Sequence, residues 1–289
     1  MRRLFEKLIA AAELCRIRIS LFIAVSAIAG YLISPGAPSF PLMAWLAAGV
    51  FFLSCGASAF NQFAEAETDS LMPRTCTRPV PSGRMKQGHA LLISAGLLLA
   101  GISVLFVTRG ALPAALGAAA FLWYGVVYTP LKQKTPFALL PGALAGAVSP
   151  AIGWVCGGGS LLSPRLFIFC LFFYIWQIPH FWIFLLRYGR QYEEAGLPSV
   201  TTVFSGPGLR RIIFAWELCT AASALLIAAL YQTGPFTRAL SALPAAWIIA
   251  GGAAVFSRKN HRLDFALRSI DVCALAITCL TAAGRFIAV

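Results

Sequence analysis

The sequence predicts an all-α, polytopic membrane protein, a bundle of nine transmembrane helices in one membrane domain over residues 1–289. Its residues are 59% hydrophobic and 11% charged, whereas soluble domains are roughly 25% charged. Apolar runs recur along the chain at about the 20-residue length that a helix needs to cross the hydrocarbon core of a bilayer. Closed barrels also satisfy their backbone in lipid, but these runs are too long and too uniform for barrel strands.

The apolar runs follow one another with short interruptions. Within one of them, Gly142 and Gly146 show the small-xxx-small spacing that lets membrane helices pack closely. We place the nine spans at approximately residues 17–34, 40–60, 89–108, 111–128, 137–156, 164–186, 209–231, 236–256 and 264–288.

The basic residues indicate how these spans are oriented. The net charge of +13 could suggest a nucleic-acid partner. With a cytoplasmic N-terminus, however, the cytoplasmic segments hold all 23 lysines and arginines except Arg109, Arg165, Arg238 and Arg285. This is the positive-inside distribution, so we expect the charge to reflect topology in the plasma (inner) membrane, with no nucleic-acid partner. The eight cysteines are scattered and lack the paired spacing of disulfides or metal sites.

The first long polar connection, "NQFAEAETDSLMPRTCTRPVPSGR", concentrates acidic residues on the predicted cytoplasmic side. Of the ten acidic residues in the chain, Glu65, Glu67 and Asp69 lie here. If the second span continues as a helix, Asn61, Glu65 and Asp69 recur every four residues and form one stripe, and Glu67 points away from it. Clustered oxygen ligands at a membrane edge suit a hard cation such as Mg²⁺.

Basic residues near this stripe point to a phosphorylated substrate. Arg74, Arg78, Lys132 and Lys134 lie on the same predicted face. Mg²⁺ held by the carboxylates, with these cations on the remaining oxygens, would stabilise diphosphate as a leaving group. A lipid chain on that diphosphate would enter the bundle, so the residues predict transfer of a prenyl group. The simpler alternative is a solvated face whose carboxylates pair loosely with the arginines.

Three stretches carry a resemblance to a known family. The first has the form Asn-x-x-x-acid-x-x-x-Asp followed by Met-x-Arg-Thr-x-x-Arg-Pro; the others are "YTPLKQKTPFALLPGALAGAVSPAIGWVCGGG" at 128–159 and "WQIPHFWIFLLRYGRQYEEAGLPSV" at 176–200. In this order they resemble the signatures of the UbiA-type intramembrane prenyltransferases, in the form of the protoheme IX farnesyltransferases (heme O synthases). The resemblance covers roughly residues 10 to 285 and implies nine helices in a single UbiA-type domain.

The resemblance also implies a reaction: farnesylation of a vinyl group of heme b, with addition of a hydroxyl, to give heme O. Farnesyl diphosphate would lose diphosphate with the help of Mg²⁺, the vinyl carbon would attack the allylic cation, and water would quench the porphyrin-side cation. Heme A synthase or a terminal oxidase could take the product. Aromatic rings stabilise such a cation and exclude water. The candidates, each with a core or lipid-facing position as the alternative, are Trp123, Tyr124, Phe172 and Trp176.

Two polar side chains interrupt the sixth predicted span. Gln177 and His180 are costly in lipid and are expected to face an interior cavity, and Pro179 bends the helix. The span is predicted to end near Arg187, which places His180 about 10 Å below the cytoplasmic edge. There His180 could bind the heme iron or activate water; the alternative is a hydrogen bond between helices.

The family signatures complete the set of candidate residues. Tyr128 and Lys132 in "YTPLK" are one helical turn apart and match positions expected near the diphosphate, with interfacial anchoring as the alternative. The predicted catalytic residues are Asn61, Glu65, Asp69, Tyr128, Lys132 and His180. The predicted substrate-binding residues are Arg74, Arg78, Lys134, Trp176, Gln177, Gln191 and Tyr192.

The third signature departs from the family at one position. The family commonly has Asp-Tyr-x-x-Ala-Gly, whereas this chain has "QYEEAG" at 191–196. Gln191 can offer its carbonyl oxygen to Mg²⁺ but brings no charge. A second metal site would therefore depend on Glu193 or Glu194, and we include Glu193 with the stripe residues in the predicted metal-binding set.

Two other functions fit parts of the pattern. One is a UbiA-type prenyltransferase with a quinone precursor or another aromatic acceptor, although "RTCTRP" and "WQIPHF" favour heme. The other is a transporter or lipid-binding protein without catalysis. A transporter would place polar residues near the bilayer midplane beside broken helices, whereas the charges here cluster at one mouth.

Overall fold

The structure, a computed structural model, describes residues 2–232, 234–257 and 259–287. This part of the chain is helical and without strands, which confirms the predicted membrane-helix bundle. Eight helical segments are long and apolar enough to cross a membrane, as expected of a multi-pass membrane protein. They are α3 (Phe40–Ala64), α5 (Gln87–Arg109), α6 (Ala111–Leu122) continued by η1 (Trp123–Tyr128) and α7 (Thr129–Leu131), α8 (Leu139–Cys156), α9 (Pro164–Glu194), α11 (Gly206–Tyr231), α12 (Pro235–Gly252) continued by η2 (Ala253–Phe256), and α13 (Asn260–Ile287).

The first predicted span is the shortest of the apolar helices. α2 (Ile17–Leu32) has 16 residues, a length of about 24 Å at 1.5 Å per residue. With α2 included, each of the nine predicted spans coincides with an apolar helix in the described part of the chain, so the expected number is approximately right. Residue 288, the predicted end of the ninth span, and Arg258, counted above among the cytoplasmic cations, lie outside the described residues.

α9 is longer than the sequence predicted. The span was expected to end at residue 186, but the helix continues to Glu194 and has 31 residues, about 46 Å. Pro179 lies inside the helix without ending it. Because this length exceeds a hydrocarbon core of roughly 30 Å, the last turns of α9 project beyond it. His180 is accordingly farther from the end of its helix than expected.

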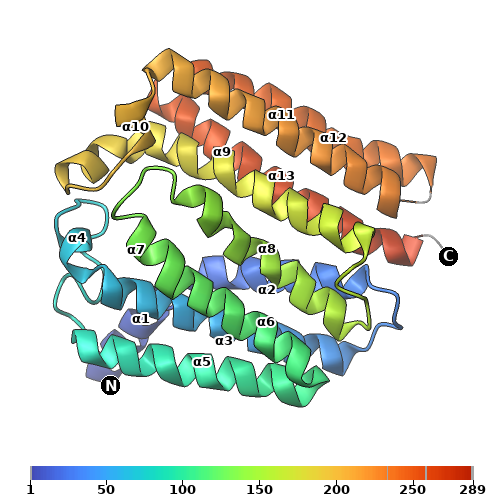
Figure 1. Ribbon diagram of the computed structural model, residues 1–289, viewed down its shortest axis with the longest axis horizontal. Helices are drawn as coiled ribbons and strands as arrows, with labels where there is room; N and C mark the ends of the chain where they lie inside the picture. Colours follow the sequence, from blue (N-terminus) through green and yellow to red (C-terminus); the bar gives the residue numbers. More distant parts are fainter. Residues whose placement is uncertain (1, 233, 258, 288–289) are drawn as a thin grey trace.

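The helices pack as a bundle with its short helices at one end. α3 lies between α2 and α5, α2 also packs on α8, and α13 returns the chain to α9 and α2. Figure 1 shows α4 (Ala66–Ser70), α7 and α10 (Val200–Val203) at the left end of the bundle, where the N-terminal helix α1 (Arg2–Leu14) also lies. The C-terminus lies at the opposite end. We call the end with α4, α7 and α10 the loop end.

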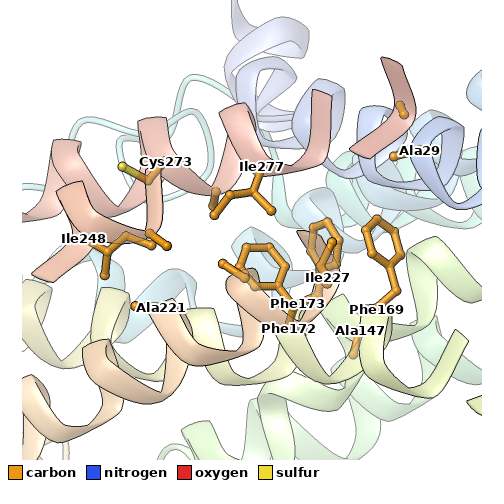
Figure 2. Close-up of a cluster of buried hydrophobic side chains, with 14 residues drawn as sticks. Ala29, Ala147, Phe169, Phe172, Phe173, Ala221, Ile227, Ile248, Cys273 and Ile277 are labelled. Atoms are coloured by element: carbon orange, nitrogen blue, oxygen red, sulfur yellow. The ribbon is translucent and has the colours of Figure 1, made fainter. Parts of the chain in front are cut away.

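The main hydrophobic core lies among α9, α11, α12 and α13, with contributions from α2 and α8. Phe169, Phe172 and Phe173 of α9 pack there against Ile227, Ile248 and other apolar side chains (Figure 2). Phe172 is fully buried in this cluster, so this candidate aromatic belongs to the core, as its alternative interpretation held. The eight cysteines are free thiols, in agreement with their scattered spacing.

Candidate active site at the loop end

The predicted acidic stripe forms across the junction of α3 and α4. Glu65 ends one helix and begins the next with φ −114° and ψ 15°, so the predicted continuous helix is interrupted there. The hydrogen bonds nevertheless keep the four-residue step: Glu65 N–H donates to the Asn61 carbonyl (3.0 Å) and Asp69 N–H to the Glu65 carbonyl (2.8 Å). The side chains of Asn61, Glu65 and Asp69 are all buried, whereas Glu67 is exposed.

Each buried carboxylate of the stripe contacts one cation. An Arg78 guanidinium nitrogen lies 2.6 Å from Asp69 Oδ2, and Lys132 Nζ contacts Glu65 Oε1. Burial and the nearby Arg16 lower the pKa of Arg78, and Asp69 opposes them. Burial also acts to lower the pKa of Lys132, but the Glu65 carboxylate and the nearby tyrosines together outweigh it, and the net pKa is raised. Lys132 therefore stays charged at neutral pH.

A wide helical turn positions the second signature. Residues Trp123–Tyr128 form a π-helix, η1, directly before α7. Lys132 N–H donates to the Tyr128 carbonyl at 3.0 Å, which confirms that the two residues are one turn apart despite Pro130. Lys132 Nζ lies 5.9 Å from the centre of the Tyr128 ring. The centres of the Tyr124 and Tyr128 rings are 5.3 Å apart. π-bulges are frequent at functional sites.

Two other candidates from this segment lie toward the exterior. The Trp123 side chain is exposed, and its indole Nε1–H donates to the Pro141 carbonyl at 2.7 Å. That bond ties η1 to α8 and leaves Trp123 outside the aromatic group around Lys132. Lys134 is exposed, two residues beyond the Lys132 contact. An exposed ammonium group adds less to binding than a buried one because water screens its charge.

Two glycines of α8 make room for the side chains of the site. A Cβ at Gly142 would lie 2.3 Å from a ring carbon of Tyr128, and one at Gly146 would lie 2.5 Å from the Gln177 amide oxygen. The small-xxx-small spacing therefore admits two of the predicted site residues. Gln177 Nε2 donates to the Ala143 carbonyl (3.0 Å) and to the Phe173 carbonyl (2.6 Å), so its amide joins α9 to α8.

The third signature meets the first at the loop end. The Arg74 guanidinium lies over the Phe184 ring of α9, 4.8 Å from its centre. Tyr192, near the end of α9, packs in a small apolar cluster with Met72. The Tyr192 hydroxyl is also close enough to Lys132 to act to raise the pKa of that lysine. The long C-terminal part of α9 therefore lies against the segment that carries the acidic stripe.

Gln191, Glu193 and Glu194 differ in whether their side-chain oxygens already have partners and so in how readily they could bind a metal. Gln191 Oε1 is buried and has no hydrogen-bond partner among the described residues. Glu193 accepts a hydrogen bond of 2.5 Å from the Thr201 hydroxyl, and Glu194 pairs with Arg190 at 2.8 Å. Gln191 Oε1 could therefore bind a metal without breaking a hydrogen bond, whereas Glu193 would first have to release Thr201.

The donor set fits a magnesium ion shared with a substrate. The described residues hold no group of three or more His, Cys, Asp and Glu side chains able to bind a metal alone. Mg²⁺, however, is commonly bound by one or two carboxylates together with substrate phosphates and water. Glu65 and Asp69 offer carboxylates, and Asn61 and Gln191 offer amide oxygens, of which the buried Gln191 Oε1 has no hydrogen-bond partner among the described residues.

An acid–base contact in the membrane interior was not predicted from the sequence. His180 Nδ1 lies 2.7 Å from Asp271 Oδ1 of α13, and the Trp176 ring lies between His180 and Phe22, with centroids 5.5 and 5.3 Å away. An aspartate inside a predicted span was the available signal, because such residues are costly there. Arg16, counted above for topology, lies near enough to Arg78 that its charge acts to lower the pKa of Arg78.

Comparison with known proteins identifies the family. The family model described as the UbiA prenyltransferase family matches residues 23–276, which is most of the chain. The chain belongs to the UbiA prenyltransferase family. Among proteins of this family named protoheme IX farnesyltransferase, one from Oleidesulfovibrio alaskensis is 42% identical over 65% of this chain and 67% of its own. One from Geobacter sulfurreducens is 39% identical over 77% of this chain and 82% of its own.

Solved structures share the UbiA fold. A structure reported for digeranylgeranylglyceryl phosphate synthase has a TM-score of 0.76 at 17% identity and covers 98% of this chain and 99% of that one. A UbiA homolog from Archaeoglobus fulgidus bound to GPP and Mg²⁺ has a TM-score of 0.72 at 13% identity and covers 96% of this chain and 98% of that one. At such identities the likeness shows the fold.

Proposed function

We propose that the protein transfers the farnesyl group of farnesyl diphosphate to a vinyl group of protoheme IX (heme b), adds a hydroxyl group, and releases heme O and diphosphate. The acid–base cluster at the loop end carries the proposal: the buried carboxylates of Glu65 and Asp69 with the half-buried Lys132 and Arg78. Farnesyl transfer to heme is also the activity named for relatives that are 36 to 42% identical.

Mg²⁺ is the cofactor that this site would hold. Asn61, Glu65 and Asp69 would bind it, with Gln191, and Glu193 after its release from Thr201, as ligands of a second ion. The UbiA homolog solved with GPP and Mg²⁺ supports a metal-bound prenyl diphosphate in this fold. Bound there, the metal neutralises charge on the diphosphate and makes it a better leaving group.

The basic residues would bind the rest of the diphosphate. In the structure, Lys132 and Arg78 contact Glu65 and Asp69, so each cation is already close to where a phosphate oxygen would lie. When the carboxylates turn to a metal, both cations become available to phosphate oxygens at little cost in reorganisation. Arg74 has a buried, unpartnered Nε atom and would join them. Lys134 would add a weaker, exposed charge.

The bond changes then follow in order. The bond between C1 of the farnesyl group and the diphosphate oxygen breaks, and the heme vinyl group forms a new carbon–carbon bond to C1. The positive charge passes to the carbon beside the porphyrin, where water adds and loses a proton. Ring faces stabilise a nearby cation. Tyr124 and Tyr128, beside Lys132, would do so near the diphosphate, and Trp176 beside His180.

The location and partners extend this proposal. The basic residues favour the plasma (inner) membrane with the N-terminus and the loop end in the cytoplasm, where farnesyl diphosphate, a charged soluble donor, can reach Glu65 and Asp69. We place the activity in a single UbiA-type domain over residues 1–289. Because the farnesyl chain makes heme O strongly lipophilic, heme A synthase or a terminal oxidase in the same membrane is the expected recipient.

One experiment tests donor, acceptor and product together. The protein is expressed in a bacterial host that lacks heme O synthesis, and its membrane hemes are extracted and weighed by mass spectrometry. We expect a new heme that carries one hydroxyethylfarnesyl group, and its absence from cells with Asp69→Asn. Heme b alone, with the protein present in the membrane, would contradict the heme acceptor. In that case a prenylated quinone precursor or other aromatic compound in the same extract would identify a different acceptor.

A further inference from the structure

α9 and α13 are joined by two acid–base contacts at a common spacing. His180 Nδ1 lies 2.7 Å from Asp271 Oδ1, and Arg187 Nε lies 3.3 Å from Asp264 Oδ1. Arg187 lies two helical turns beyond His180 on α9, toward the loop end. Asp264 lies two helical turns before Asp271 on α13, toward the start of that helix. The two contacts are therefore successive rungs between antiparallel helices, and both acidic residues lie on one face of α13.

Helix packing near water explains the contact of Arg187 with Asp264, but it does not explain the contact of His180 with Asp271. Arg187 near the loop end is always charged and can pair with Asp264 close to water. Asp271 lies well inside α13, where a carboxylate costs free energy and adds nothing to the packing of apolar helices that a small residue would not supply. Its side chain is 45% exposed and that of His180 is 25% exposed. Neither is sealed into the core, so the pair is accessible to a bound molecule.

The contact selects one tautomer of the imidazole. Asp271 Oδ1 lies 2.7 Å from Nδ1, although the two atoms are not aligned as a hydrogen bond. A carboxylate that accepts from Nδ1–H holds the proton on that nitrogen and leaves the Nε2 lone pair free, and it raises the basicity of a metal-binding histidine. Nε2 of His180 is not part of the contact with Asp271. The Trp176 ring beside it, tilted by 36°, and Phe22 beyond that ring provide flat apolar surfaces suited to a porphyrin.

We propose that Asp271 is a positioning residue that keeps the proton on Nδ1 of His180 and so presents Nε2 to the iron of the heme acceptor. The proposal rests on the acceptor proposed above and adds to it the ligand and the residue that tunes it. A carboxylate-supported imidazole is a stronger electron donor. A bond from the imidazole to the iron would hold the porphyrin at its centre. A vinyl group at the porphyrin edge would then keep one position relative to the farnesyl carbon.

The test uses the full-length protein in lipid nanodiscs with heme b as the probe. The iron–histidine stretching band of the ferrous complex and the reduction potential are measured for the unchanged protein, His180→Ala and Asp271→Asn. Asp264→Asn is the matched control, because Asp264 forms the other rung on the same helix face. Asp271→Glu keeps the carboxylate and separates its chemistry from a folding defect.

We expect His180→Ala to lose the iron–histidine band. Asp271→Asn should keep heme bound, with the band at lower frequency and the reduction potential shifted upward, and Asp271→Glu should restore both toward their original values. Asp264→Asn should change neither.

Four results would overturn the inference. An unchanged band and potential in Asp271→Asn, or equal shifts in Asp264→Asn, would reduce the contact to helix packing. An unchanged band in His180→Ala would place the iron elsewhere. Failure of the unchanged protein to bind heme, with farnesyl diphosphate still bound in calorimetry, would contradict the acceptor itself and with it the ligand.

Discussion

Glu65 and Lys132 meet at the loop end from two different membrane-spanning segments, α3 and the segment that ends with α7. The Glu65 side chain is 4% exposed, so its charge depends on the lysine for compensation. The same is true of Asp69 and Arg78. The carboxylates are thus neutralised in pairs, and the metal diphosphate proposed above would exchange one set of ionic partners for another.

The first prediction concerns the buried carboxylates. Asp69→Asn and Glu65→Gln should each lower the rate of heme O formation by about 100-fold or more, the usual loss when a group that stabilises transition-state charge is removed. Glu67→Gln is the control, because Glu67 is exposed beside the same stripe. Rates are measured on purified protein whose monodispersity matches the unchanged chain. Comparable rates for Asp69→Asn and Glu67→Gln would remove the stripe from the mechanism.

The second prediction separates two lysines of one loop. Lys132→Gln should raise the KM for farnesyl diphosphate about tenfold or more, because a charge-assisted hydrogen bond contributes roughly 1.5–3 kcal/mol. Lys134→Gln should have a smaller effect, since Lys134 is exposed. Steady-state kinetics with varied farnesyl diphosphate measure both. A larger loss at Lys134 would show that the diphosphate lies farther out than Glu65.

The third prediction concerns the metal. Chelation should abolish turnover, and added Mg²⁺ should restore it. Gln191→Asp should lower the Mg²⁺ concentration that gives half-maximal rate, because it places a negative charge where the buried Gln191 Oε1 has no partner. Gln191→Ala should raise that concentration. If both variants respond to Mg²⁺ as the unchanged protein does, Gln191 is not a metal ligand.

The fourth prediction separates donor from acceptor. His180→Ala should leave the Kd for farnesyl diphosphate within about twofold and lower heme O formation by roughly tenfold or more. The reason is that His180 contacts Trp176 and Asp271, whereas Glu65 and Asp69 contact Lys132 and Arg78. Calorimetry and product analysis measure the two quantities. Equal loss of both would assign His180 a structural role.

The fifth prediction uses two helical glycines. Gly142→Ala would place a Cβ 2.3 Å from the Tyr128 ring, so we expect a loss of about 1–3 kcal/mol in stability together with reduced turnover. Gly96→Ala is the matched control in α5, where an added Cβ meets nothing within 4 Å. Thermal unfolding and activity are measured side by side. A Gly142→Ala protein as stable and active as Gly96→Ala would show that Tyr128 moves freely.

Local sequence patterns predicted the helices and the acidic stripe well. Apolar runs mark membrane spans because every residue facing lipid must be apolar, and the four-residue spacing of Asn61, Glu65 and Asp69 survives even where Glu65 interrupts the helix. The end of α9 was missed because its last turns are polar and project from the lipid, so hydropathy no longer marks the helix.

The sequence did not predict which side chains from distant segments are in contact. Nothing near Glu65 names Lys132 as its partner rather than Arg74, and Asp271 drew no attention because a single acid within an apolar run does not reveal which helix it faces. Both pairings depend on the rotation of each helix about its axis, which is set by the packing of whole faces, such as Gly146 of α8 against Gln177 of α9.

The π-helical turn at Trp123–Tyr128 has a consequence for how this segment can change its length. A π-turn holds one residue more than an α-turn, and each α-helical residue turns the chain by about 100°. Deleting Val126 would convert the turn to an α-helix with little change in hydrophobicity, and Lys132 would keep its angular position toward Glu65, because the removed residue is the one that the wide turn had absorbed. The wide turn thus lets this segment hold one extra residue without rotating the lysine, and lineages can gain or lose that residue while Lys132 stays beside Glu65.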